Sequence, residues 1–312
     1  STWQGNMVLV SNTTGIDVAT GSELRVEGIV SNFGFEKFGG GTLELAGTAS
    51  NTMTTASTVW NGVLELNKTP GSNAIANALT VGDHIGAAGT AVVRLLQANQ
   101  IPDNFTLTLN GEGAFDLNGQ SDTIGGLVMA IAPTASSSVA SGAGTLTVAG
   151  NITVNVVNGG MPVSATINGN LALGGAAART ITVNDSAAIE DLVITATISD
   201  AAAGWTKAGA GRMVLPNANT YTGTTTVGAG ELVIRNAQSL GTGANGTIVN
   251  SATDGNQVNM GSLIIDANLT ITGEALRLNT GNSGDGNQSA RNGGGFQGSG
   301  GLRVLAGRTV AW

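Results

Sequence analysis

His84 is the residue best suited by type to general acid–base chemistry, because it is the only histidine among the 312 residues of the chain. A catalytic histidine needs an orienting partner and a nucleophile within hydrogen-bond reach. Asp83 is its immediate neighbour, and adjacent residues of an extended segment point to opposite faces. We therefore interpret His84 as a corner or surface residue and not as a catalytic base.

Paired carboxylates are the second group that could perform chemistry, since two of them can act as acid and base on a glycosidic bond. The acids are spread thinly: Glu190 and Asp191 form the only adjacent pair, and Asp116 and Asp122 flank a turn. Stacking of distant segments could still bring acids together, so a carbohydrate-active site stays open as an alternative. We predict that the chain is not an enzyme and has no catalytic residue.

Two Gly- and Asn-rich stretches around Asp254 and Asp285 contain the oxygen ligands that Ca²⁺ prefers. A calcium loop at either position stays open as an alternative. The chain has no cysteine, so it has neither a disulfide framework nor a thiolate metal site. We predict no bound metal and no cofactor.

Several Asn-x-Ser/Thr triplets match the acceptor pattern for N-glycosylation. A chain this rich in Asn and Thr produces such triplets by chance. We interpret their asparagines as stacked or turn residues. They are Asn12, Asn67, Asn104, Asn151, Asn184, Asn245, Asn268 and Asn287.

The charge balance disfavours nucleic acid as a partner, because phosphate binding needs a clustered basic patch and the chain has 20 acids against 12 bases, a net charge of −8. No apolar run approaches the ~20 residues of a membrane-spanning helix. Residues 1–10 lack the basic and apolar regions of a signal peptide. We therefore expect that a signal peptide has been removed and that the protein is extracellular or at a cell surface.

Short segments with alternating apolar residues recur along the whole chain, separated by Gly, Asn, Ser or Asp, which is the pattern of strands and turns. The chain is 41% hydrophobic but only 10% charged and contains 49 glycines, so it folds with a surface of Thr, Ser and Asn. Residues 87–100 come closest to a helical period, and a local helical turn stays open there. Elsewhere we expect no helix, and the fold class is all-β.

An internal similarity separates a β-sandwich from a solenoid of stacked coils. Residues 35–45 and 205–215 place an aromatic residue, a lysine, two glycines and an apolar pair at the same offsets. A second set of matching positions follows in residues 59–66 and 227–234, where the first copy is two residues longer in between. Repeats that keep their strands but accept insertions in loops are typical of stacked coils.

We therefore predict that residues 1–312 form one continuous elongated β-solenoid. Each apolar pair would point inward and pack on the pair in the next coil, and glycine would form the corners. With about 20 to 25 residues per coil, the chain would give on the order of 13 coils. Residues 281–301 read as a Gly-rich loop or arm, followed by a terminal strand over residues 302–312.

Residues 205–243 contain three blocks in a fixed order. They open with Lys207, Gly209 and Gly211, continue with Tyr221-Thr-Gly, and close with a Val-Gly-Leu pattern that ends at Leu232. This segment resembles the autotransporter-associated β-strand repeat, also called the passenger-associated transport repeat. Residues 35–66 resemble a degenerate copy without the Tyr-Thr-Gly centre.

The resemblance implies a right-handed parallel β-helix that is exported to the bacterial cell surface or beyond. It says little about activity, so three functions remain. The first is a structural protein, such as a spacer, matrix component or filament subunit. The second is an adhesin that binds surface glycans or host proteins, and the third is a carbohydrate-active β-helix enzyme.

Self-assembly is the interaction that we predict. Exposed strand edges are usually protected by Lys, Pro or inward charge, whereas residues 302–312 carry only Arg303 and Arg308, and residues 7–10 are apolar. Because the two ends differ, contact between them is heterologous and would propagate as an open fibre. We expect a homo-oligomer or homopolymer joined through the ends of the solenoid.

Overall fold

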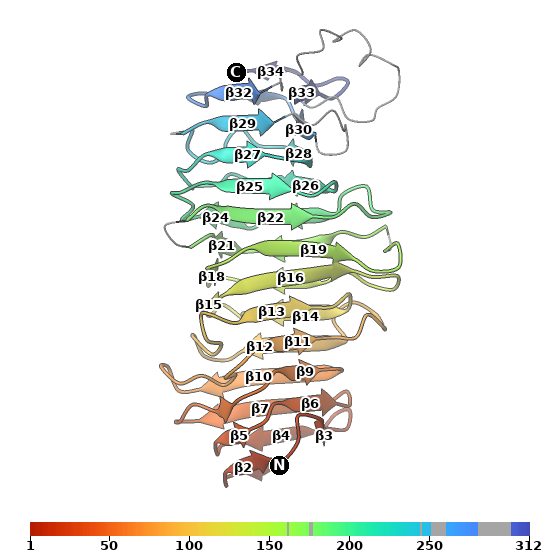
Figure 1. Cartoon of the computed structure of the whole chain (residues 1–312), viewed down its shortest axis with the longest axis vertical. Coiled ribbons are helices and arrows are strands. Elements are labelled where there is room, and N and C mark those ends of the chain that lie inside the picture. The colour runs from red at the N-terminus through yellow and green to blue at the C-terminus, as the bar shows by residue number, and fades with distance from the viewer. Residues whose placement is uncertain (161, 175–176, 244, 251–259, 280–300) are drawn as a thin grey trace.

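The computed structural model shows the chain as a rod whose coils follow one another along the long axis, from the N-terminus at one end to the C-terminus at the other (Figure 1). It describes residues 1–160, 162–174, 177–243, 245–250, 260–279 and 301–312. The described residues form strands, turns and loops without a helix, so the predicted all-β class is confirmed. Neighbouring strands pair in parallel, which confirms a β-solenoid.

One side of the rod is a sheet of 13 strands in coil order. They are β1 (Thr2–Trp3), β4 (Glu23–Val26), β7 (Thr42–Gly47), β10 (Gly62–Lys68), β12 (Ala91–Leu95), β14 (Gly113–Asp116), β17 (Ser138–Ala140), β20 (Ala165–Asn168), β23 (Leu192–Ile194), β26 (Arg212–Leu215), β28 (Gly230–Ile234), β30 (Gly261–Ile265) and β33 (Gly301–Val304).

A second side is a sheet of 12 strands. They are β3 (Thr14–Asp17), β6 (Phe35–Phe38), β9 (Ser57–Val59), β11 (Leu79–Val81), β13 (Thr106–Leu109), β16 (Gly126–Ile131), β19 (Ile152–Val156), β22 (Arg179–Val183), β25 (Trp205–Ala208), β27 (Thr225–Val227), β29 (Thr247–Asn250) and β32 (Leu276–Asn279).

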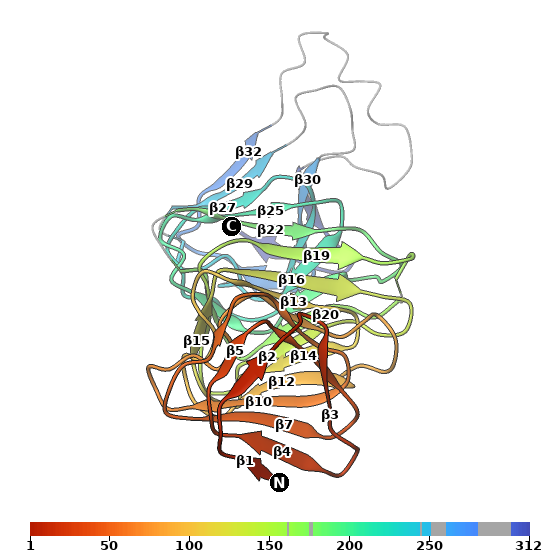
Figure 2. The same ribbon diagram turned by 60° about the horizontal axis from the view of Figure 1, so that its bottom comes forward.

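The third side is broken into three short sheets. The first contains β2 (Met7–Leu9), β5 (Val30–Asn32) and β8 (Thr52–Met53), the second β15 (Asp122–Ile124), β18 (Leu146–Val148), β21 (Asn170–Ala172) and β24 (Thr197–Ser199), and the third β31 (Leu269–Thr270) and β34 (Val310–Ala311). In the tilted view, β2 and β5 lie on a different side of the coil from β4 and β7 (Figure 2).

The coils vary in length while their strands stay in register. Glu23 pairs with Thr42, 19 residues later, whereas Gly230 pairs with Gly261, 31 residues later. The predicted 20 to 25 residues per coil is therefore a central value, and the loops absorb the difference. The 13 strands of the first sheet agree with the predicted number of coils.

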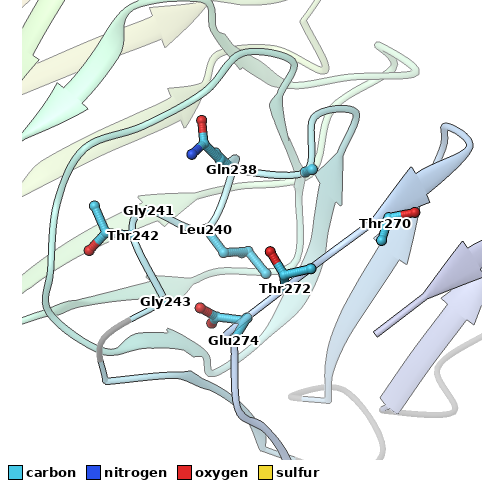
Figure 3. A pocket seen from close by; sticks show the side chains of 9 residues that line it. Gln238, Leu240, Gly241, Thr242, Gly243, Thr270, Thr272 and Glu274 are labelled. Carbon is cyan, nitrogen blue, oxygen red and sulfur yellow. The ribbon is translucent and has the colours of Figure 1, made fainter.

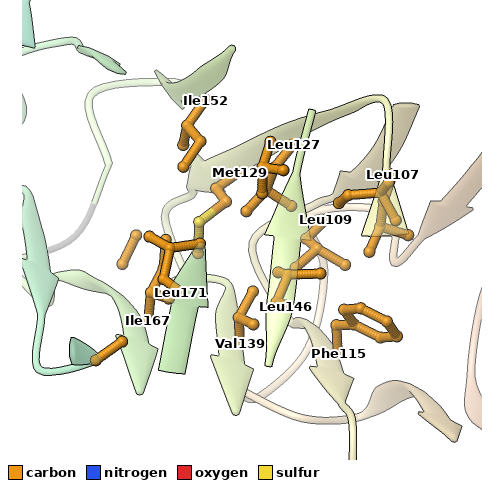
Figure 4. Close-up of a cluster of buried hydrophobic side chains, with 14 of the residues drawn as sticks. Leu107, Leu109, Phe115, Leu127, Met129, Val139, Leu146, Ile152, Ile167 and Leu171 are labelled. Atoms are coloured by element: carbon orange, nitrogen blue, oxygen red, sulfur yellow. The ribbon is translucent and has the colours of Figure 1, made fainter. Parts of the chain in front are cut away.

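Inward-facing side chains form one continuous core. Along the first sheet, Leu43, Leu64, Val93, Phe115 and Val139 stack in register on successive coils, and each is at most 1% exposed. Figure 4 shows such residues from all three sides of the rod meeting in its interior. Because each buried Leu, Val or Phe contributes about 1.5 to 3 kcal/mol, this stack supplies the main driving force for folding.

Residues 87–100 contain β12, so the helical turn that the sequence left open does not form: Ala91, Val93 and Leu95 alternate inward in register with the neighbouring coils. The predicted terminal strand over residues 302–312 is two short strands, β33 and β34, because the chain turns between them to reach another side of the coil. The Gly-rich residues 281–300 lie outside the described residues. None of the described segments is a helix long and apolar enough to cross a membrane.

Candidate functional site

Lys37 is a buried lysine near the start of the first repeat. Its side chain is fully buried although it is charged, because it occupies an inward-facing position two residues after Phe35 in β6. Its ammonium donates hydrogen bonds to the carbonyl oxygens of Phe38 (3.2 Å) and Gly39 (2.6 Å) in its own turn, and to that of Asn61 (2.8 Å) in the next coil. The three donors therefore have three acceptors, and the side chain joins two coils.

Lys207 repeats this arrangement in the second repeat. It is also fully buried, two residues after Trp205, and its ammonium donates to the carbonyl oxygens of Ala208 (3.0 Å), Gly209 (2.7 Å) and Ala229 (2.9 Å). We call each set of three carbonyl groups with its lysine a lysine cradle. Two segments far apart in the sequence thus use the same polar contact between coils.

Glycine is required where each cradle closes. Gly62 comes directly after Asn61, and Gly230 directly after Ala229, the residues of the next coil whose carbonyl oxygens accept from the lysines. The two glycines have φ of 70° and 64°, in the left-handed region that favours glycine. A Cβ atom on Gly230 would lie 2.5 Å from the carbonyl oxygen of Gly209, and one on Gly62 would lie 2.5 Å from Lys37 Nζ. The spacing of Lys and Gly in the repeat is therefore set by the cradle.

Burial shifts the titration of both lysines. It lowers the pKa of Lys37 to about 8 and that of Lys207 to about 7, because an ammonium loses hydration inside the rod. The three carbonyl oxygens oppose this effect, since they accept hydrogen bonds from the protonated form. With no exposed surface on either side chain, the cradle stabilises the fold and does not present an amine to a substrate.

The Tyr-Thr-Gly centre of the second repeat forms a second buried contact. Tyr221 is 1% exposed, and its ring lies 6.1 Å from that of Trp205 at an interplanar angle of 78°. Its hydroxyl shares a hydrogen bond of 2.6 Å with Thr225 Oγ1, and burial raises the pKa of the hydroxyl. The first repeat has no Tyr-Thr-Gly sequence, so it does not form this contact.

His84 lies in a corner, as we predicted. It has φ of 72°, burial lowers its pKa, and its Nδ1 accepts a hydrogen bond from the backbone N–H of Gly111 (3.2 Å). The carboxylate of Glu112, which is 1% exposed, accepts from the backbone N–H groups of Asp83 and His84. This corner therefore ties a loop to the next coil, and sequence reasoning missed Glu112 because its partners are backbone groups.

The adjacent acids Glu190 and Asp191 serve different contacts. Asp191 is 1% exposed and accepts from the backbone N–H groups of Ser186 (2.9 Å) and Arg212 (2.7 Å). Glu190 forms an ion pair with Arg235. The two carboxylates are therefore engaged separately in holding loops and coils together.

Asp116 belongs to a row of charges on the outer face of the first sheet. Arg25, Glu44, Glu65, Arg94 and Asp116 occupy the same register position on successive coils. Arg94 Nε contacts the Asp116 carboxylate at 2.9 Å. Exposed pairs of this kind contribute about 0 to 1 kcal/mol each, so the contact between Arg94 and Asp116 adds little to stability. Asp122 lies on another side of the rod, at the start of β15.

The asparagines of the Asn-x-Ser/Thr triplets mostly form hydrogen bonds between coils, which agrees with their interpretation as stacked residues. Those with such a bond are Asn67 to Glu44, Asn151 to Thr180, Asn184 to Asn155, Asn245 to Thr222 and Asn268 to Thr309. Asp254, Asp285 and Asn287 lie outside the described residues. Among the residues that are described, no group of three His, Cys, Asp or Glu side chains could hold a metal ion.

A small cavity of about 70 Å³ lies near the C-terminal end of the described stack (Figure 3). Gln238, Thr242, Thr270, Thr272 and Glu274 contribute polar groups to its lining. Glu274 is 8% exposed, accepts a hydrogen bond of 2.6 Å from Thr247 Oγ1, and has its pKa raised by burial. Binding pockets for drug-sized molecules have volumes of about 300 to 1,000 Å³, so this cavity is smaller than a pocket of that kind.

The sequence profile of the passenger-associated-transport-repeat matches residues 35–66 and 206–234. These segments contain the two lysine cradles, so the family match and the geometry identify the same units. The first match has the boundaries that we predicted, and the second ends earlier than residue 243. No curated protein matched the chain, and no solved structure did. The chain is therefore a parallel β-solenoid in which two segments match the passenger-associated-transport-repeat family.

Proposed function

We propose that this chain is a non-enzymatic structural rod in a protein that is secreted or displayed at the bacterial cell surface. The observation that carries the proposal is that both repeats use the same lysine cradle within one continuous stack. A stack with a shared core transmits position and force along its axis, because each coil is fixed to its neighbours. The candidate acids Asp116, Glu190 and Asp191 already serve structural contacts, which further supports this role.

The proposed location includes export and removal of a signal peptide. Its support is the presence of passenger repeats in a chain without cysteine. The test is brief protease treatment of intact source cells, followed by mass spectrometry of the released peptides. Peptides of this chain should appear in the released or secreted fraction, and their recovery only after lysis would contradict the proposed location.

We also infer that a second copy associates with an end of the rod. The first coil exposes Trp3 (51%), Val8 (64%) and Val10 (84%), and the last described coil exposes Leu278 (46%) and Trp312 (39%). Strand edges next to these side chains can pair with another edge through main-chain hydrogen bonds. A second copy supplies both a matching edge and an apolar surface.

Sedimentation velocity over a range of concentrations, with electron microscopy of the same samples, tests this association. Leu278→Lys places a charge at one end and should abolish concentration-dependent oligomers or filaments. Deletion of residues 302–312 should do the same. Ile189→Lys is the matched control, because Ile189 is 79% exposed but lies away from the ends. Unchanged assembly of both end variants would refute end-to-end contact, as would a wild-type chain that stays monomeric.

The absence of enzymatic activity is tested with a panel of acidic and neutral polysaccharides. We expect no release of reducing or unsaturated sugars by the purified chain. Turnover that is lost in an Asp122→Asn or Glu112→Gln variant, with the fold retained, would favour the carbohydrate-active alternative.

A specific observation favours glycan binding as a second candidate function. Phe38 and Trp60 lie at the same register position on neighbouring coils, with ring centroids 6.2 Å apart and planes 11° apart. Phe38 is 38% exposed, and Trp60 Nε1 donates to Glu36 Oε2 at 3.3 Å. Aromatic rings next to a carboxylate suit the apolar face and hydroxyl groups of a neutral sugar.

The second repeat has Thr206, Ala208 and Gly228 at the positions of these three residues, although it keeps its cradle. The rings are therefore not required by the repeat. A glycan array with wild-type protein and a Trp60→Ala variant tests this function. Binding to neutral glycans that Trp60→Ala loses would support it, and uniform absence of binding would refute it.

A further inference from the structure

One corner of the rod is closed by asparagine side chains that join three successive coils. Asn51 Oδ1 accepts a hydrogen bond of 2.8 Å from the backbone N–H of Val30 in the preceding coil. Asn51 Nδ2 donates one of 2.7 Å to the carbonyl oxygen of Ala74 in the following coil. The side chain is 3% exposed, so its two bonds satisfy backbone groups that water does not reach.

Asn219 makes the same pair of contacts in the second half of the rod. Its Oδ1 accepts from the N–H of Ile198 (2.7 Å), and its Nδ2 donates to the carbonyl oxygen of Ser239 (2.6 Å). Its own backbone N–H donates to the residue before that acceptor, Gln238. The amide group is suited to this corner because it combines an acceptor and a donor.

Asp122 occupies the corresponding corner of a middle coil. Its Oδ2 accepts from the backbone N–H groups of Gln100 (2.8 Å) and Ile101 (3.3 Å), and its backbone N–H donates to the carbonyl oxygen of Thr145 (3.2 Å). The side chain is 2% exposed, but its Oδ1 has no hydrogen-bond partner. In an ionised carboxylate both oxygens are acceptors, whereas the second side-chain group of the asparagines, Nδ2, is a donor.

This corner also lies at a gap between two of the short sheets on the third side of the rod. The sheet β2-β5-β8 ends at β8, and the next sheet on that side begins with β15, whose first residue is Asp122. Toward the preceding coil, β15 therefore has no strand partner among the described residues. The carboxylate supplies the polar contact to that coil in place of a strand ladder.

Protonation changes what the side chain can do. Burial is the main cause that raises the pKa of Asp122 to about 7; the nearby charge of Asp103 acts in the same direction, and the backbone N–H groups that donate to the carboxylate oppose it. Within residues 99–103, 118–124 and 144–148, which form this corner, Asp103 is the only other titratable group. When protonated, Oδ1 becomes a donor and the side chain acquires the pattern of asparagine.

We propose that Asp122 is a proton-controlled joint of the rod, which ties three coils together when protonated, as Asn51 and Asn219 do, and loosens the joint before Thr145 when ionised. The joint at Asp122 is then most stable at mildly acidic pH, and it opens more often at alkaline pH. This role is independent of whether the rod is structural or binds a ligand.

Hydrogen exchange measured by mass spectrometry at pH 5, 6, 7 and 8, corrected for intrinsic exchange rates, tests the proposal. Because a folded-state pKa raised above the unfolded value favours the protonated native state, the stabilisation is lost as the pH rises through the folded value. Peptides that cover residues 99–125 and 145–150 should lose protection, with an opening constant that rises roughly 100-fold between pH 5 and pH 8. Peptides that cover residues 162–173, which contain no titratable side chain, provide a reference in the same molecule.

Two reciprocal variants make the test specific. Asp122→Asn should keep full protection at pH 8 and remove the pH dependence of residues 99–125. Asn219→Asp should make protection around residues 198–240 fall as the pH rises, opposite to the rise that Lys207 gives this region of the wild-type chain. A wild-type joint whose protection is independent of pH, or an Asp122→Asn variant that loses protection at every pH, would overturn the proposal.

Discussion

Substitution of Gly230 by alanine tests the geometry of the lysine cradle directly. The residue has φ of 64°, and a Cβ atom would lie 2.5 Å from the carbonyl oxygen of Gly209 and 2.7 Å from that of Gly211. The left-handed conformation costs alanine about 1 to 2 kcal/mol. Displacement of packed backbone costs about 2 kcal/mol more. The carbonyl group of Gly209 is also the closest partner of Lys207 Nζ, at 2.7 Å, so the displacement weakens the cradle.

The sum is about 3 to 4 kcal/mol, which raises the opening constant of the repeat by roughly several hundred-fold. Hydrogen exchange by peptide is the appropriate assay, because coils of a solenoid unfold with their neighbours and a single global midpoint averages over them. Protection should fall in residues 205–234 and stay unchanged in residues 35–66.

Gly228→Ala is the matched control, two residues away in the same turn. Its φ is not positive, and an added Cβ would lie 3.2 Å from the nearest atom, the carbonyl oxygen of Lys207. We expect a change of less than about 1 kcal/mol. If Gly230→Ala is as silent as Gly228→Ala, or if both repeats lose protection equally, the proposed role of the cradle is wrong.

Three further predictions concern the buried polar groups. All three lysines, Lys37, Lys68 and Lys207, are fully buried, so an amine-reactive reagent should label only the N-terminus of the native chain, and mass spectrometry should find labelled lysines only after unfolding. Burial lowers the pKa of Lys207 to about 7, so between that pH and about 10.4 the unfolded state binds more protons than the folded state. The free energy of unfolding should therefore rise with pH in this window. Urea titrations should show the rise in the wild-type chain and not in Lys207→Met. Tyr221→Phe removes the hydrogen bond to Thr225 and should lower the free energy of local unfolding in residues 205–234 by about 1 kcal/mol, with no change in residues 35–66.

Alternation and internal similarity were sufficient to predict the architecture. Pairs such as Leu64 and Leu66 point inward in register with Leu43 and Leu45, as their period of two requires. The similarity of residues 35–66 to residues 205–234 predicted stacking, because each copy needs a neighbour to cover its apolar edge. The two cradle lysines also have a pattern in the sequence, since Lys37 and Lys207 each lie two residues after a buried aromatic residue in the inward-facing phase of the strand.

Side-chain contacts between coils could not be predicted from the sequence pattern. Glu112 reaches the backbone of residues 83 and 84, and Phe38 meets Trp60, only because loops of unequal length return the chain to the same side of the rod. The register between coils depends on how many residues each loop inserts, and no local pattern states that number. The sequence also gave a wrong prediction of one terminal strand, because the turn between β33 and β34 directs them to different sides.

The sequence by itself determined the class of fold, the position of the repeats and the inward phase of each strand, because all three depend on local periodicity. Tertiary structure alone decided which polar groups meet. Asp122 and Asn219 differ in sequence context, yet they occupy equivalent corners because stacking places each between two other coils. Whether such a side chain satisfies its neighbours depends on the donors and acceptors that those coils present, and these are brought together only when the rod is complete.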